Sequence, residues 1–83
     1  MPVEPQAALE IVRFLASGPT PEQIVTFHPS AEANQRAYAL IAADRAGTIS
    51  ADERAELDSS IYLEHLMRLI KAEANALLHQ RAS

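Results

Sequence analysis

The apolar positions of this chain recur at three- and four-residue intervals, which is the spacing of amphipathic helices. Gly and Pro interrupt this pattern and divide the chain into separate helical segments. The pattern predicts an all-α fold with three main helices and one short helical turn. The main helices are expected at about 6–17, 31–46 and 51–81, and the turn near 21–26. We expect residues 1–83 to form a single small helical domain, with residues 1–4 as a loose N-terminus.

Capping signals mark the ends of these helices. Gly18 and Gly47 follow the first and second main helices, where Gly is a common C-terminal stop. Ser50 and Glu53 match the S-x-x-E capping box, which fixes the start of the long C-terminal helix. The other helix-start signals are Ser30 and the pair Thr20 and Gln23. Because the loop at 47–50 is short, the last two helices should form a helical hairpin.

The segment 18–29 holds three of the five prolines. We interpret it as a structured connector that contains the short helical turn. Its apolar residues Ile24, Val25 and Phe27 are expected to pack on the core. The alternative is a short strand over the sequence IVTFH, residues 24–28.

The last helix carries more apolar surface than the shorter helices of the chain are expected to cover. At 100° per residue, one stripe contains Leu63, Leu66, Ile70, Ala74 and Leu77, flanked by Tyr62 and Leu69 on one side and by Met67 and Leu78 on the other. Leu57 and Ile61 lie on another side, so they are assigned to a neighbouring helix of the same chain. About 30 residues at 1.5 Å each give roughly 45 Å of helix. A compact domain of this length has a diameter of only about 30 Å, so one end of the helix should overhang.

Two interpretations of this stripe remain open. In one, the first two main helices cover it completely, and it is internal core. In the other, the stretch 66–78 binds a second chain, either another copy or a different protein. Glu64, Arg68 and Lys71 would then set the orientation at the rim. The predicted partner-binding residues are Leu63, Leu66, Met67, Arg68, Ile70, Lys71 and Leu77.

Composition and charge narrow the function classes. The net charge is −4, and the seven cations are scattered singly, so we expect no nucleic-acid binding by this chain alone. No apolar run approaches the roughly 20 residues of a membrane span, so we expect no membrane association. With no Cys, the default expectation is a cytoplasmic protein. Sixteen of the residues are Ala, which buries little area, so association is the expected support for so small a core.

Candidate chemistry is sparse. The segment Asp44–Glu53 imitates the second half of an EF-hand loop, but Ala42 and Ala46 stand where oxygen ligands are required. The three histidines, His28, His65 and His79, have no metal-binding spacing, and their roles are open. We therefore expect no catalytic, cofactor or metal site, and no enzyme activity.

Residues 46–74 (AGTISADERAELDSSIYLEHLMRLIKAEA) follow the pattern G-T-[LI]-[ST]-x-x-E-x-x-E-L, then H-L-x-x-L-[LI]-K-A. The matching residues are Gly47, Thr48, Ser50, Glu53, Glu56, Leu57, His65, Leu66, Leu69, Ile70, Lys71 and Ala72, and Phe27-His28-Pro29-Ser30 resembles the F-x-P-S that precedes this pattern. The chain thus resembles short, largely uncharacterised bacterial all-helical proteins. The resemblance implies that some members are antitoxin-like partners of a toxin or nuclease.

The leading hypothesis is a non-enzymatic interaction module that binds a second chain through the C-terminal helix. That chain would be another copy, giving a homo-oligomer, or a toxin-like partner. The first alternative is a small regulatory or sensor domain built on the Asp44–Glu53 loop. The second is a freestanding structural domain.

Overall fold

The computed structural model describes residues 5–82, so the predicted loose N-terminus at 1–4 lies outside the described residues. The helices are α1 (Gln6–Ala16), α2 (Pro21–Val25), α3 (Ala31–Ala46) and α4 (Ala51–Ala82). The all-α prediction is confirmed, with boundaries within one residue of those expected. The alternative strand at 24–28 does not form, because Ile24 and Val25 belong to α2.

The predicted caps form. Ser50 Oγ accepts a hydrogen bond from the Glu53 backbone N–H at 3.1 Å, and the Glu53 carboxylate accepts one from the Ser50 N–H at 2.9 Å. Thr20 and Gln23 make the same reciprocal box at the start of α2. Gly47 ends α3 in the left-handed conformation, with φ of 72°, which is costly for residues that carry a Cβ. Local sequence therefore sets where each helix starts and stops.

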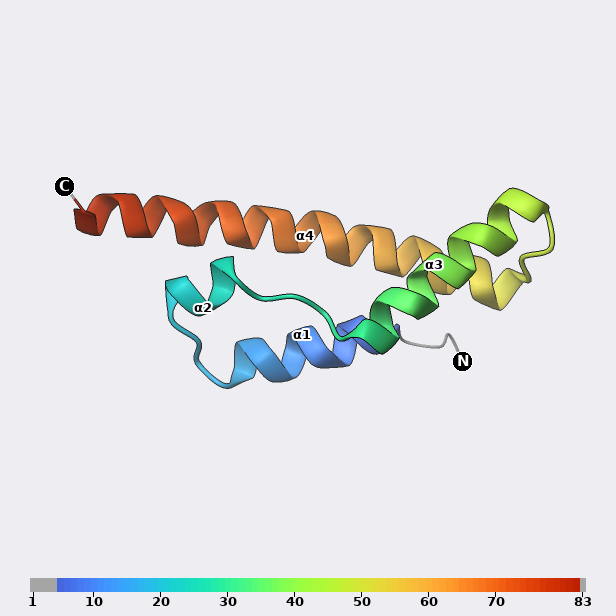
Figure 1. The fold of residues 1–83 in the computed structure, drawn as a ribbon, viewed down its shortest axis with the longest axis horizontal. Helices are drawn as coiled ribbons and strands as arrows, with labels where there is room; N and C mark the ends of the chain where they lie inside the picture. Colours follow the sequence, from blue (N-terminus) through green and yellow to red (C-terminus); the bar gives the residue numbers. More distant parts are fainter. Residues whose placement is uncertain (1–4, 83) are drawn as a thin grey trace.

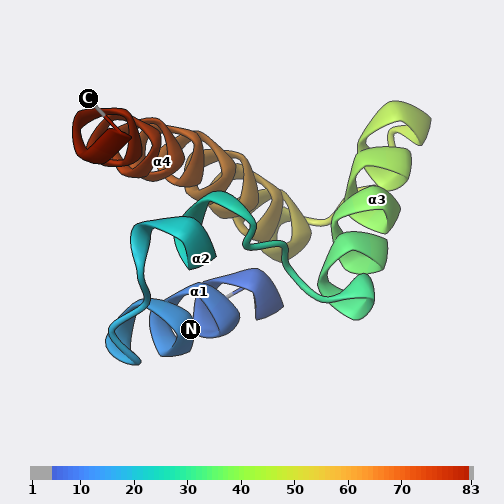
Figure 2. The same ribbon diagram turned by 60° about the vertical axis from the view of Figure 1, so that its left-hand side comes forward.

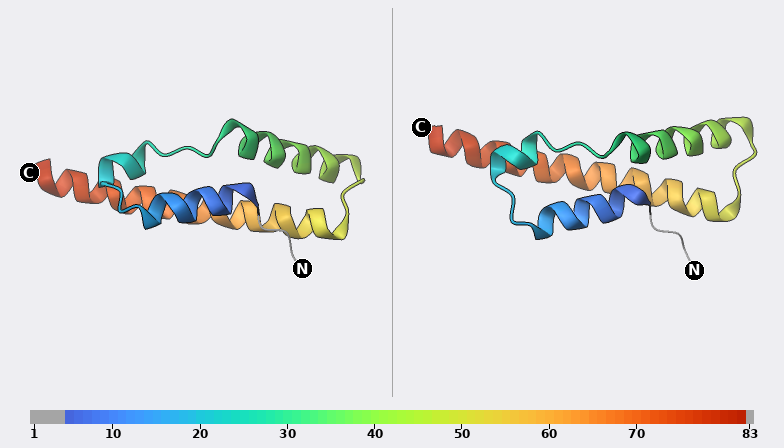
Figure 3. Two further views of the ribbon diagram at one scale, coloured as in Figure 1. Left: turned by 90° about the horizontal axis from the view of Figure 1, so that it is seen from below. Right: turned by 60° about the horizontal axis from the view of Figure 1, so that its bottom comes forward.

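The molecule is elongated along α4. Its extents are 51 × 23 × 20 Å, and its radius of gyration is 15.0 Å, against about 12 Å for a compact chain of this length. The C-terminal end of α4 extends past α2 (Figure 1). In the right-hand view of Figure 3, α4 runs between α1 on one side and α3 on the other. The expected overhang of the long helix is thus present.

Each of the shorter helices covers a different part of α4. The helix α3 packs beside the N-terminal part, and α2 packs further along the rod. The helix α1 contacts both α3 and α4, but α3 stands apart from α2 (Figure 2). The buried apolar residues are Ile11, Ala33, Leu40, Leu57, Met67 and Ala74. The buried residues of α4 among these, Leu57, Met67 and Ala74, lie within an arc of about 100° around the helix.

Two contacts fix α1 to the connector before α3. The Phe14 and Phe27 rings stack with their centroids 4.3 Å apart. The Glu10 carboxylate accepts hydrogen bonds from the Ser30 N–H at 2.7 Å and from Ser30 Oγ at 2.6 Å. Since Ser30 also caps α3, Glu10 joins the first helix to the start of the third.

Candidate protein-binding surface

The stripe predicted on α4 divides between two faces of the helix. Met67 is buried in the chain's own core, and Leu63 and Ile70 are half-buried beside it. Leu66 and Leu77 instead point to solvent. Part of the stripe is therefore internal packing, and only part is available to another protein.

The predicted rim cations lie away from the exposed part. Lys71 Nζ donates a hydrogen bond to the backbone oxygen of Phe27 at 2.7 Å, so this side chain ties α4 to the connector. Arg68 pairs with Glu64 at 2.7 Å, in the expected i,i+4 geometry. Arg68 lies two residues, or about 200° around the helix, from Leu66. Neither cation lies beside Leu66 or Leu77, and the rim role of Glu64, Arg68 and Lys71 stays a prediction.

The exposed apolar side chains of α4 share one side of the helix. We call Tyr62, Leu66, Leu69 and Leu77 the outer face of α4. Their exposed fractions are 65%, 37%, 53% and 48%. At 100° per residue they fall within an arc of about 80°, whose centre is about 110° around the helix from the buried Met67 and Ala74. Tyr62, Leu66 and Leu69 are neighbours on this arc and form one apolar patch, whereas the exposed Glu73 separates them from Leu77.

The helix α1 extends this apolar surface. Leu9, Val12 and Leu15 are exposed, and Val12 lies on the same side of α1 as Ala8. Ala8 lines a shallow hollow with Ser59, Tyr62 and Leu63 of α4. The helix α1 thus adjoins the outer face of α4 where Ala8 lies beside Tyr62.

Sequence periodicity alone predicts some of these positions wrongly. Tyr62 and Leu69 are only flanking positions of the predicted stripe, yet they are the most exposed members of the outer face. Ile61 is expected to pack with Leu57 on a neighbouring helix, but it is largely exposed. It lines the groove between α3 and α4 with Leu57 and Ile41, so it lies on the expected side of α4 but remains largely exposed there. The spacing of 62, 66 and 69 is the signal that identifies the outer face.

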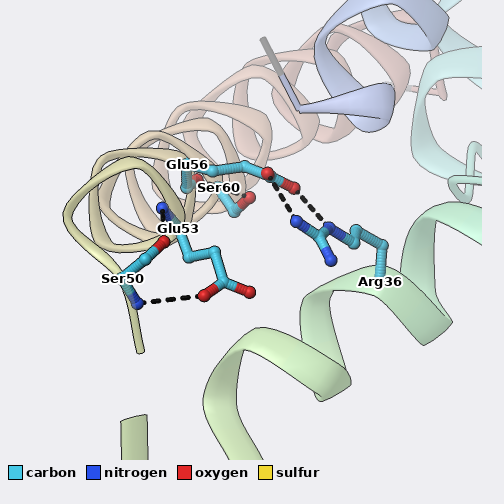
Figure 4. Close-up of polar contacts among 5 residues, drawn as sticks. All are labelled: Arg36, Ser50, Glu53, Glu56 and Ser60. Atoms are coloured by element: carbon cyan, nitrogen blue, oxygen red, sulfur yellow. Dashed lines mark hydrogen bonds and ion pairs between the residues drawn. The ribbon is translucent and has the colours of Figure 1, made fainter. Parts of the chain in front are cut away.

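A groove of about 340 Å³ lies between α1, α3 and α4, on the side of α4 away from the outer face. Its apolar lining includes Ile11, Ile41 and Leu57. Its main polar feature is Arg36 of α3, which donates hydrogen bonds to both carboxylate oxygens of Glu56 at 2.8 and 3.0 Å (Figure 4). The hydrogen bonds to Glu56 raise the pKa of Arg36. Arg36 of α3 and Glu56 of α4 pair with each other, and this ion pair holds α3 against α4.

The loop that imitates an EF-hand uses its carboxylates within the chain. Asp44 forms an ion pair with Arg54, and Glu53 caps α4. Within residues 5–82, no three His, Cys, Asp or Glu residues come together as a possible metal site. His28, His65 and His79 are all exposed, and His79 Nδ1 lies 2.8 Å from the Asn75 backbone oxygen. The described contacts of this loop are those of a helix-to-helix connector.

The lowered pKa values of Glu10 and Glu53 predict how the stability of the fold depends on pH. The Ser30 N–H, which donates to Glu10, lowers the pKa of that carboxyl, and the Ser50 N–H lowers the pKa of Glu53. A lowered folded-state pKa adds stability that is present above the ordinary value of 4.5 and is lost as the pH falls below it. We expect the urea midpoint to drop between about pH 5 and pH 3. The Glu10→Gln variant should show a smaller drop, and an equal drop would contradict this assignment.

Comparisons of the chain with protein-family models, with curated proteins and with solved structures found no match. Among the described residues, no helix combines the length and apolarity that a membrane span requires.

Proposed function

We propose that this protein is a non-enzymatic helical interaction module that binds another protein chain through the outer face of α4. The observation that carries the proposal is the exposure of Tyr62, Leu66, Leu69 and Leu77 on one arc of a 32-residue helix. A partner helix laid on this arc would remove these side chains from water, which stabilises the complex by roughly 25 cal/mol for each Å² of apolar area buried.

The charged residues support a binding role over a catalytic one. Arg36, Arg54 and Arg68 each pair with a carboxylate of the same chain. Glu10 and Glu53 accept hydrogen bonds from helix-capping backbone groups. Because these groups already pair within the chain, they are poor candidates for a general acid, a general base or a substrate-binding charge.

The proposed partner is a cytoplasmic protein chain. The resemblance of residues 46–74 to short bacterial proteins favours an antitoxin-like role, in which the partner is a toxin-like protein. The small core favours the other candidate, a second copy of this chain. In both cases the mechanism is burial of an apolar helix face, with Leu66 and Leu69 at its centre.

Photo-crosslinking in the cells that naturally produce the protein tests this proposal. A benzophenone amino acid replaces Leu69, whose side chain is 53% exposed, so the change should leave the fold intact. The same amino acid at Gln35, an exposed position on α3, is the matched control. We expect a discrete crosslinked protein band from position 69 and none from position 35. The absence of a band from position 69 would contradict the interaction module.

A further inference from the structure

The exposed area of the chain is large for its mass. Its accessible surface is 5944 Å², whereas a folded monomer of 9.1 kDa is expected to expose about 4,900 Å². The excess is roughly 1,000 Å², and a standard protein interface removes about 800 Å² from each partner. One interface of ordinary size would therefore bring this chain to the exposure of a typical folded protein.

Six positions on the side of α4 that carries Tyr62, Leu66 and Leu69 could form a coiled-coil seam, and these three are its large apolar residues. Positions 59, 62, 66, 69, 73 and 76 follow one another at alternating intervals of three and four residues. All six of these residues are exposed. Their side chains are Ser59, Tyr62, Leu66, Leu69, Glu73 and Ala76. The seam thus has leucines at its centre, polar groups on either side of them, and small residues at both ends.

We propose that this seam pairs with the same seam of a second copy of the chain, with the two α4 helices antiparallel. The proposal rests on the interaction module described above and names its partner. With the two-fold axis between Leu66 and Leu69, Leu66 of one copy faces Leu69 of the other. In the next layer outward, Tyr62 faces Glu73, and its hydroxyl is placed to donate a hydrogen bond to that carboxylate. The outermost layer pairs Ser59 with Ala76, which allows the backbones to approach closely.

Charge selects this orientation over the parallel one. A parallel pair would place Glu73 beside Glu73 of the second copy within the seam, and like charges in that position are destabilising. The antiparallel pair separates these two carboxylates. It also sets Asp58 at one border of the seam near His79 of the second copy, an acid facing a base. Ala8 of α1 lies beside Ser59 and Tyr62 of the seam, so the second copy would also meet α1 there.

Single cysteines distinguish the two orientations, because the natural chain has none. We would prepare the purified Ser59→Cys and Ala76→Cys variants and oxidise each alone and as a mixture. In the antiparallel pair, position 59 lies beside position 76 of the second copy. Two copies of position 59 are separated by 17 residues of helix rise, about 25 Å, far beyond disulfide reach. We expect crosslinked dimers from the mixture and little from either variant alone.

A mixture of Ser59→Cys with Asn75→Cys is the matched control, since Asn75 is exposed but lies outside the seam. Dimers from either single variant alone would show parallel helices and overturn the proposal, as would equal crosslinking in the control mixture. Sedimentation of the unmodified chain should give a dimer mass, and Leu69→Glu should give a monomer with unchanged helix content. A monomer mass for the unmodified chain would contradict the homodimer proposal. The interaction module would survive that result if position 69 still crosslinks a different protein in cells.

Discussion

Replacing Leu40 with alanine is expected to lower the free energy of unfolding by about 3 kcal/mol. Leu40 is 1% exposed and is the most completely buried large side chain of the described chain. It belongs to α3, which contacts both α4 and α1, so a cavity at this position weakens the attachment of a whole helix. For a domain of this size, such a loss lowers Tm by about 15 °C.

The matched control is Leu9→Ala, which makes the same chemical change at a side chain that is 52% exposed. We expect this variant to lose less than about 1 kcal/mol, because an exposed leucine leaves no cavity when it is truncated. Thermal melting followed by circular dichroism at one fixed protein concentration measures both changes. Fixing the concentration matters because self-association would make Tm depend on it. Equal shifts for the two variants would contradict the placement of Leu40 at the centre of the core.

Helix boundaries were the most predictable part of this fold, because their causes lie within a few residues. Gly47 stops α3 through its own left-handed conformation, and Ser50 and Glu53 cap α4 through hydrogen bonds to each other's backbone. The i,i+4 pair of Glu64 and Arg68 is equally local and also forms. None of these features depends on how the helices pack, so the sequence alone was sufficient to find them.

The faces of α4 were less predictable, because periodicity shows which residues share a side but not which neighbour covers them. Met67 was expected at a partner surface, yet it is buried in the chain's own core. The five-residue α2, which looked like part of a connector, packs along α4, where Ala74 is buried. The hydrogen bond from Lys71 to the Phe27 oxygen holds the connector close to α4. That hydrogen bond joins residues 44 positions apart, and no local pattern encodes it.

The uncovered side of α4 follows from the same arrangement. All three shorter helices contact α4, yet its buried residues Leu57, Met67 and Ala74 lie within one arc of about 100°, and Tyr62 and Leu69 outside that arc remain exposed. A long central helix is covered on all sides only if the helices packed around it are together long enough to surround it. Here α1 has 11 residues and α2 has five, against 32 in α4. The proposed need for a partner is therefore a consequence of unequal helix lengths.

The ion pair between Arg36 and Glu56 is expected to respond unequally to loss of its two members. The Glu56 side chain is 6% exposed, whereas that of Arg36 is 46% exposed. Arg36→Met removes both donors and leaves a carboxylate buried without a partner, at a cost of about 2 kcal/mol after allowance for the exposure of the pair. Glu56→Met should cost about 1 kcal/mol or less, because the guanidinium that remains can turn to water.

The double variant, with both residues replaced by Met, is expected to be more stable than Arg36→Met alone, since it removes the buried charge together with its partner. Urea unfolding of the four proteins in a double-mutant cycle measures the coupling. Arg68→Met is the control, because the pair of Arg68 with Glu64 has the same chemistry but both side chains are mostly exposed, and it should change stability by less than about 0.5 kcal/mol. If Glu56→Met proved more damaging than Arg36→Met, the burial of the Glu56 carboxylate could not be the main reason why the pair matters. The pair would then act mainly by anchoring Arg36 across the groove between α3 and α4.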